Sequence, residues 1–128
     1  MSEYTQAAGR YGVPGNTSTL LAAADTAKDI VAARTNYTFY MQRLTYVPTV
    51  VAAQAITIRS KTTTTALYAL IAASVAAPYV MNFGDQGLPI TAGEALEAVP
   101  ASAGPSGRFH VEGYYKPTSV IAHTASNQ

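Results

Sequence analysis

Alternating apolar and polar residues, the pattern of β-strands, recur through most of the chain. The clearest case is residues 108–115, where apolar side chains or glycine hold the odd positions and mainly polar ones the even positions. Pro117 follows and is expected to end this strand. Residues 55–61 alternate in the same way, which predicts that Ile56 and Ile58 face the interior.

A phase change in the most strand-like segment predicts an irregular strand. Residues 37–47 are rich in aromatic and β-branched residues, which favour strands. Between Met41 and Leu44 the apolar positions fall one residue out of step. Such a shift indicates either a β-bulge or a strand buried on both faces for part of its length. Pro48 is expected to end this strand.

Short apolar runs between Gly, Pro and Thr turns predict further strands. They are residues 29–34, 66–71, 79–83 and 95–99. Alanines would also allow a helix over residues 20–33, but the strand-like run that follows favours a strand. We therefore predict an all-β fold, a single antiparallel β-sandwich or jelly-roll-like domain of about seven to eight short strands with extended N- and C-terminal arms.

The predicted sandwich domain spans residues 20–117, between an N-terminal arm at 1–19 and a C-terminal tail at 118–128. Glycines and a proline interrupt the arm, so neither strand nor helix periodicity survives there. Terminal segments of this kind are usually disordered. The arm's two tyrosines and a valine are more apolar than a solvated tail requires, so docking on a neighbouring molecule is the alternative.

Charge is scarce in this chain of 128 residues, which has the length of one domain. Charged residues make up 12%, about half the usual share for a soluble domain, and the formal net charge is +1. A nucleic-acid binder needs a concentrated basic face, and the eight basic residues are spread along the chain. The sequence has no cysteine, which excludes disulfides and thiolate metal sites. We expect no nucleic-acid partner.

Membrane and secretion signals are not apparent. The chain opens without a basic region followed by an apolar run, so we expect no signal peptide. The most apolar stretch, residues 66–80, is too short to span a bilayer. These patterns predict a soluble protein made in the cytosol, with no membrane partner.

The candidate chemical groups do not combine into a catalytic or metal site. His110 and Glu112 share one strand face, but a zinc site needs one or two more ligands. Glu94 and Glu97, three apart on a strand, point to opposite faces and do not pair as acid and base. No phosphate-binding glycine loop or nucleophile elbow is present. We expect no enzyme activity, no cofactor and no metal.

Candidate contact residues are tyrosines of the arm and arginines of the strands. Arg34, Arg43 and Arg59 lie on neighbouring strand segments and either line one face or are scattered over the surface. The residues predicted to form an interface are Tyr4, Arg10, Tyr11, Val13, Arg43 and Arg59.

One segment resembles a known family. Residues 79–84 read Tyr-Val-Met-Asn-Phe-Gly, and residues 87–96 read Gly-Leu-Pro-Ile-Thr-Ala-Gly-Glu-Ala-Leu. Together with residues 28–31, 56–59 and the final strand at 109–115, they resemble small β-sandwich virion proteins of tailed bacteriophages. The likeness is closest to capsid decoration (cement) proteins and covers about residues 28–116.

The resemblance implies a structural role without chemistry. Decoration proteins of this kind sit as trimers on the capsid surface and clamp adjacent major-capsid subunits. It therefore implies the major capsid protein and further copies of this chain as partners, and a virion location after synthesis in the host cytoplasm. The scarcity of charge agrees, because charged residues are depleted at interface cores. The alternatives are a phage tail, neck or head-fibre component, or a carbohydrate-binding β-sandwich module.

Overall fold

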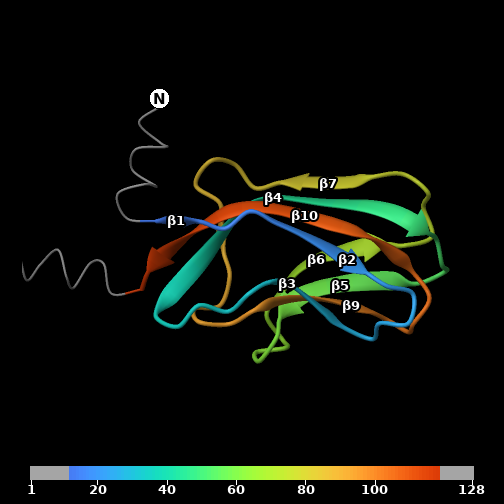
Figure 1. Cartoon of the computed structure of the whole chain (residues 1–128), viewed down its shortest axis with the longest axis horizontal. Coiled ribbons are helices and arrows are strands. Elements are labelled where there is room, and N and C mark those ends of the chain that lie inside the picture. The colour runs from blue at the N-terminus through green and yellow to red at the C-terminus, as the bar shows by residue number, and fades with distance from the viewer. Residues whose placement is uncertain (1–11, 119–128) are drawn as a thin grey trace, which may run out of the picture.

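Two antiparallel β-sheets packed face to face make up the computed structural model, which describes residues 12–118 (Figure 1). The strands are β1 (Val13–Pro14), β2 (Thr17–Leu21), β3 (Lys28–Val31), β4 (Tyr37–Val50), β5 (Ala55–Ser60), β6 (Leu67–Ala72), β7 (Tyr79–Asn82), β8 (Leu88–Pro89), β9 (Leu96–Pro100) and β10 (Ser106–Pro117). This confirms the all-β prediction and the β-sandwich. Within the described residues, no helix is long and apolar enough to cross a membrane.

The first sheet is built around β10 and β4, which pair along nearly their whole length. β1 and β2 pair with the other edge of β10, and β7 and β8 pair with the other edge of β4. The second sheet has the order β3-β9-β5-β6. The chain passes from β2 to β3 at one side of the sandwich and from β6 to β7 at the other, so β6 and β7 are edge strands of different sheets.

The core lies between the two sheets and is formed by the inward positions of each strand. Ile56 and Ile58 are fully buried, as their alternation predicted. The rings of Tyr46 on β4 and Phe109 on β10 pack with their centroids 4.6 Å apart. Burial of Ile56, Ile58 and Phe109 contributes about 1.5 to 3 kcal/mol each.

The phase change in the fourth strand is a β-bulge. Glu112 of β10 lies opposite Arg43, but the next residue, Gly113, lies opposite Met41, which leaves Gln42 as the extra residue on β4. The bulge allows Met41 and Leu44, three positions apart, both to face the core with no exposed surface. The prediction of a bulge is confirmed.

Pro48 does not end this strand, contrary to the prediction, because β4 continues to Val50. Pro48 lies opposite Gly107 of β10. The pairing of β4 with β7 starts at Tyr46, so at Pro48 no strand of residues 12–118 pairs with the second side of β4. A proline, which lacks an N–H, is tolerated at such a locally unpaired edge.

Residues 13–19 belong to the sandwich, although the sequence placed them in the N-terminal arm. β1 and β2 pair with β10 and so extend the first sheet by one position. Gly15 lies between them against the rings of Phe39 and Tyr115, where a Cβ atom would come within 2.7 Å and 2.8 Å. The missing side chain thus allows the segment to lie close on the sheet. The remaining arm and the tail at 119–128 lie outside the described residues.

The threonine tract after β5 is fixed by one carboxylate. Glu94 accepts hydrogen bonds from the backbone N–H groups of Thr63 (2.7 Å) and Thr62 (3.1 Å) and from the Thr63 hydroxyl (2.7 Å). These bonds, the Thr63 N–H first among them, lower the pKa of Glu94 below its ordinary value of 4.5. The ionised carboxylate of Glu94 therefore ties the loop after β5 to the segment that precedes β9.

Replacement of Glu94 by glutamine is expected to lower the free energy of unfolding at pH 7 by a few tenths to about 1 kcal/mol, since solvent screens this exposed group. The folded-state pKa is depressed, so the contribution is present above the unfolded value and is lost as the pH falls through the folded value. Urea unfolding of both proteins from pH 7 to pH 3 checks this. A difference that stays constant over that range would show that the charge is not its cause.

Candidate interaction surface

One side of the sandwich carries no charged residue. Residues 62–84 contain no Asp, Glu, Lys or Arg. This run includes both edge strands, β6 and β7, and residues 73–78 that join them. We call β6, β7 and residues 73–78 the neutral side. The edge strand β3 on the opposite side carries Lys28 and Asp29, so the two sides differ in their charge.

The neutral side exposes large apolar side chains. Leu67, Leu70, Val75 and Val80 are each more than half exposed, at 63%, 64%, 54% and 59%. Among the described residues β6 pairs only with β5, so its outer edge has no strand beside it. Natural edge strands are usually protected by charge, proline or a covering segment, because free backbone groups pair with other chains. β6 has no charge or proline, which makes it a candidate contact edge.

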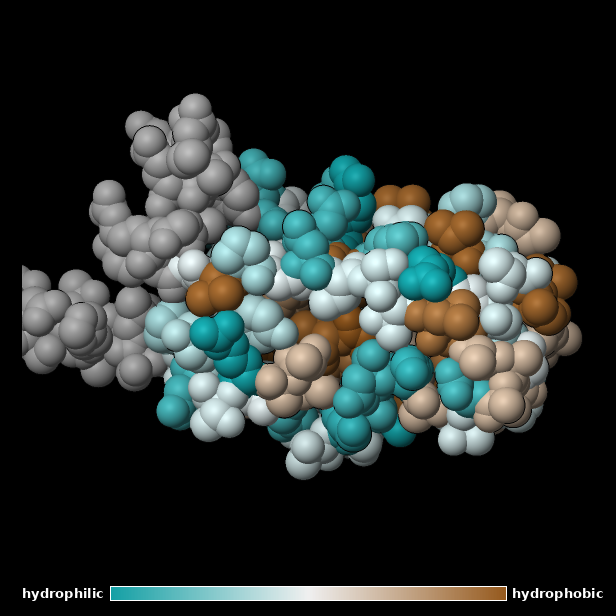
Figure 2. Space-filling view, in the orientation of Figure 1, coloured by the Kyte–Doolittle hydropathy of each residue, from teal (hydrophilic) through white to brown (hydrophobic). Residues whose placement is uncertain are grey.

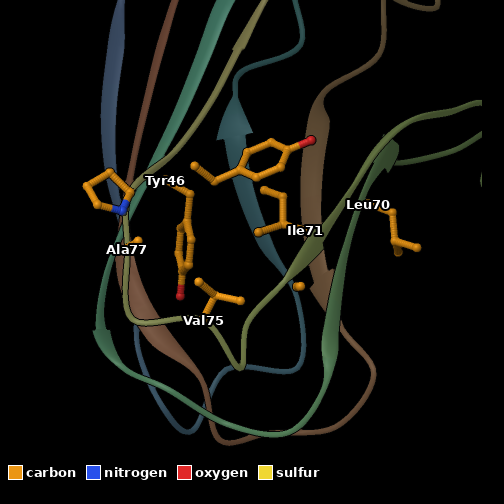
Figure 3. Close-up of a pocket in the computed structure, with 8 residues that line it drawn as sticks. Tyr46, Leu70, Ile71, Val75 and Ala77 are labelled. Carbon is orange, nitrogen blue, oxygen red and sulfur yellow. The ribbon is translucent and has the colours of Figure 1, made fainter.

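A shallow groove lies between β6 and β7 on this side. It has a volume of about 210 Å³. It is lined by Tyr46, Leu70, Ile71, Ala72, Val75, Ala77, Pro78 and Tyr79. Figure 3 shows the side chains of Ile71 and Leu70, which are neighbours on β6, pointing in different directions. The two faces of β6 therefore present apolar side chains to the groove and to the outer surface.

The hydroxyl of Tyr46 is the one buried side-chain polar atom without a hydrogen-bond partner among the described residues. Tyr46 is 1% exposed and lines the groove, and burial raises the pKa of its hydroxyl. A buried polar group without a partner costs about 1 to 3 kcal/mol. Other atoms of Tyr46 therefore line the groove, while the hydroxyl itself is buried and is not presented to a ligand.

A second apolar patch lies at the end of the sandwich where β4 stops, and we call it the valine end. It consists of Leu20, Val47, Val50 and Val51, which are 39% to 49% exposed. Leu20 and Val47 lie on either side of Arg108 in the sheet register. Figure 2 shows hydrophobic residues gathered at this end, on the right of the view.

The interface residues expected from the sequence do not come together in the described structure. Arg43 and Arg59 lie in different sheets, on β4 and β5. Arg43 is half exposed and pairs with Glu112 at 3.5 Å. Arg59 donates a hydrogen bond to the buried Glu97 at 2.8 Å. Val13 is half-buried on β1, while Tyr4, Arg10 and Tyr11 lie outside the described residues.

The three arginines are thus scattered, the second of the two arrangements that the sequence allowed. The guanidinium of Arg34, which lies between β3 and β4, stacks over the Tyr37 ring at 4.3 Å. Each of the three arginines is engaged by a neighbour of its own. The apolar side chains of the neutral side and the valine end are therefore better candidates for an interface than these cations.

The side chains that the sequence offered for catalysis or metal binding lie apart from one another or make structural contacts. His110 and Glu112 are exposed on the outer face of β10. Glu97 is buried beside Arg59. Among residues 12–118, no three His, Cys, Asp or Glu side chains lie together as a metal site would require. Every described aromatic side chain is buried or half-buried.

The chain shows no relationship by sequence to the families and curated proteins with which it was compared. No protein-family model and no curated protein matches the chain. Among solved structures, a chain of the capsid asymmetric unit of cyanophage Pam1 is similar over 83% of this chain and 85% of that chain, with 12% identity and a TM-score of 0.46.

Proposed function

We propose that this chain is a structural protein of a virion, a capsid decoration protein that binds the major-capsid lattice by burying the valine end. The observation that carries the proposal is this cluster of four half-exposed aliphatic side chains at one end of a rigid sandwich. Contiguous exposed apolar surface on a soluble domain marks a contact site. The sequence resemblance to phage decoration proteins supplies the class of partner.

The valine end is formed by neighbouring strands, with Leu20 on β2, Val47 and Val50 on β4, and Val51 directly after β4. Arg108, between Leu20 and Val47, supplies one cation at the centre of the apolar patch. Arginine among apolar residues is typical of contact centres, where it pairs with a carboxylate of the partner.

A single copy would bind weakly through so small a patch, since stable interfaces bury about 800 Å² on each partner. A lattice offers many identical sites, and copies joined to one another bind it with far higher avidity than one copy does. This advantage supports the expected self-association. We propose a homotrimer, which the sequence resemblance implies. The proposed location is the capsid surface, after synthesis in the host cytoplasm.

The test uses the purified chain and empty capsids of the virus that encodes it. Val50→Asp together with Val51→Asp is expected to weaken co-sedimentation with capsids at least tenfold, because two carboxylates would be buried without partners. Lys28→Ala, on the opposite edge strand β3, is the matched control and should bind like the wild type. Equal binding of all three proteins would rule out the valine end as the contact. Absence of binding by the wild type would contradict the decoration role.

A further inference from the structure

We infer that Gln54 is a positioning residue of the proposed contact surface, because it fixes three loops beside the valine end in the conformation that meets the capsid. The loops are residues 51–54, 73–78 and 101–105, and we call them the end loops. The inference rests on the proposed function and extends it. It enlarges the contact beyond four aliphatic side chains and names the residue that shapes it.

The side chain of Gln54 joins two of the end loops. Its Oε1 atom accepts hydrogen bonds from the Ser102 backbone N–H at 2.6 Å and from the Ser102 hydroxyl at 3.0 Å. Its Nε2 atom donates to the carbonyl oxygen of Ala103 at 3.1 Å. A Cβ atom at Gly104 would come within 2.8 Å of the same Nε2 atom, so the missing side chain there leaves room for the amide. Both polar atoms of one amide thus hold two consecutive residues of the loop.

The backbone of Gln54 holds the third loop. Its carbonyl oxygen accepts a hydrogen bond from the Ala73 N–H at 2.9 Å, and the Ala73 carbonyl oxygen accepts one from the Ala52 N–H at 3.1 Å. Ala73 is buried, which anchors residues 73–78 to the core at their first position. Gln54 is therefore the residue that all three end loops have in common.

The end loops continue the surface of the valine end. Val51 in the first loop and Val75 in the second are both exposed. After the third loop, the Ser106 hydroxyl donates to the carbonyl oxygen of Leu21 at 2.9 Å and accepts from the Thr49 hydroxyl at 3.3 Å. Leu21 and Thr49 each lie next in sequence to a member of the valine end. Figure 1 shows β4 ending at the right of the view, at the end of the sandwich that these contacts hold together.

Small side chains make the backbone position decisive for this surface. The exposed alanines of the end loops are Ala53, Ala76, Ala77, Ala101 and Ala103. Alanine has no rotamers with which to adapt to a partner and loses no side-chain entropy on binding. The fit is therefore set by the backbone, and a backbone that is already fixed binds at a smaller entropic cost. Water can replace exposed hydrogen bonds such as those of Gln54 in a loosened loop, so their net contribution to stability is modest.

The end loops carry no charge. Residues 44–58, 62–84 and 98–107 contain no Asp, Glu, Lys or Arg, and each stretch supplies one of the end loops. The loops at the opposite end of the sandwich, beside the start of β4, carry Arg34 and Glu94. The partner face is therefore expected to be uncharged where it meets the end loops, because a charge buried there would lack a counter-charge.

The test compares Gln54→Ala with Gln42→Ala in the full-length chain, using empty capsids of the virus that encodes it. Gln42 also donates a hydrogen bond from Nε2 to a loop carbonyl, that of Asp85 at 2.8 Å, but away from the end loops. Gln54→Ala is expected to weaken co-sedimentation with capsids about tenfold, because only molecules with correctly placed loops can bind. Gln42→Ala should bind like the wild type.

Amide hydrogen exchange of the free proteins separates positioning from stability. Gln54→Ala is expected to exchange about tenfold faster at residues 101–104, while the amides of β4 and β10 exchange as in the wild type. Its urea midpoint should fall no further than that of Gln42→Ala. Faster exchange throughout the strands would show that the substitution loosens the whole sandwich, and it would overturn the inference.

The binding results distinguish the inference from the proposed function. If the wild type and Gln54→Ala bind capsids equally well, the inference is wrong and the proposed function stands. If Gln42→Ala loses as much binding as Gln54→Ala, the loss is not specific to the end loops and the inference is again wrong. If the wild type itself does not bind, the proposed function fails and the inference fails with it.

Discussion

Alanine in place of Gly113 is expected to lower the free energy of unfolding by about 2 to 3 kcal/mol, the cost of overpacking a closed core. A Cβ atom there would meet the carbonyl oxygen of Tyr40 and would lie 2.5 Å from Cζ of the Phe39 ring. The carbonyl is backbone of β4, which pairs with β10 along this stretch, so it has little freedom to move. Urea unfolding followed by circular dichroism measures the change as a shift in midpoint at constant slope.

Gly84→Ala is the control for this substitution. Gly84 has a φ of +86°, but nothing lies within 4 Å of a Cβ atom built on it. Alanine there meets only the backbone penalty of the left-handed region, about 1 to 2 kcal/mol. A Gly113→Ala protein as stable as the wild type would mean that β4 and β10 do not pack as closely as described.

Removal of the Arg59 side chain is the second change with a large expected effect. Arg59→Ala should lower the free energy of unfolding by about 2 to 4 kcal/mol, because it leaves Glu97 buried without its cation. The Glu97 side chain is only 7% exposed and the Nε–Oε2 distance is 2.8 Å. Thermal or urea unfolding at pH 7 provides the measurement.

Arg43→Ala is the matched comparison, since Arg43 and Glu112 form the same type of pair on the surface. Both side chains are about half exposed and 3.5 Å apart, so their loss should cost less than about 1 kcal/mol. A double-mutant cycle of Arg59→Ala with Glu97→Gln isolates the coupling between the two residues. Unchanged stability of Arg59→Ala, together with weaker capsid binding, would return Arg59 to the interface that the sequence suggested.

The strands were predictable because period-2 alternation reports directly which residues face a core. The bulge was predictable for the same reason, since an extra residue shifts the phase of every apolar position after it. Gln42 is that residue, and it separates two buried positions of β4. Local sequence was sufficient to predict a strand wherever one face of that strand is buried and the other is exposed.

Features that depend on a partner strand were not predictable in the same way. Residues 13–19 have no clear period, and they form strands because β10 offers an edge beside them. Pro48 was expected to end its strand, yet β4 continues through it because this stretch of β4 pairs with β10. In both cases the deciding contact comes from residues more than 50 positions away.

The neutral side could have been found in the sequence by its lack of charged residues, whereas the interface prediction considered where the arginines lie. The 23 residues from 62 to 84 form an uncharged run that is visible in the printed sequence. Its meaning depends on the topology, because only the fold places β6 and β7 at the same side as two edge strands. By contrast, Arg59 was predicted as a contact residue, and its engagement by Glu97 depends on the pairing of β5 with β9.

The long-range pairing of β10 also decides when this protein can fold during its synthesis. β2 and β4 both pair with β10, which is the last strand of the described chain. Neither can complete its sheet until residues 106–117 have left the ribosome. Such non-local topologies fold slowly, in milliseconds to seconds. During that interval the uncharged run at 62–84 is already exposed, so a ribosome stalled before β10 would display an aggregation-prone segment that chaperones must protect.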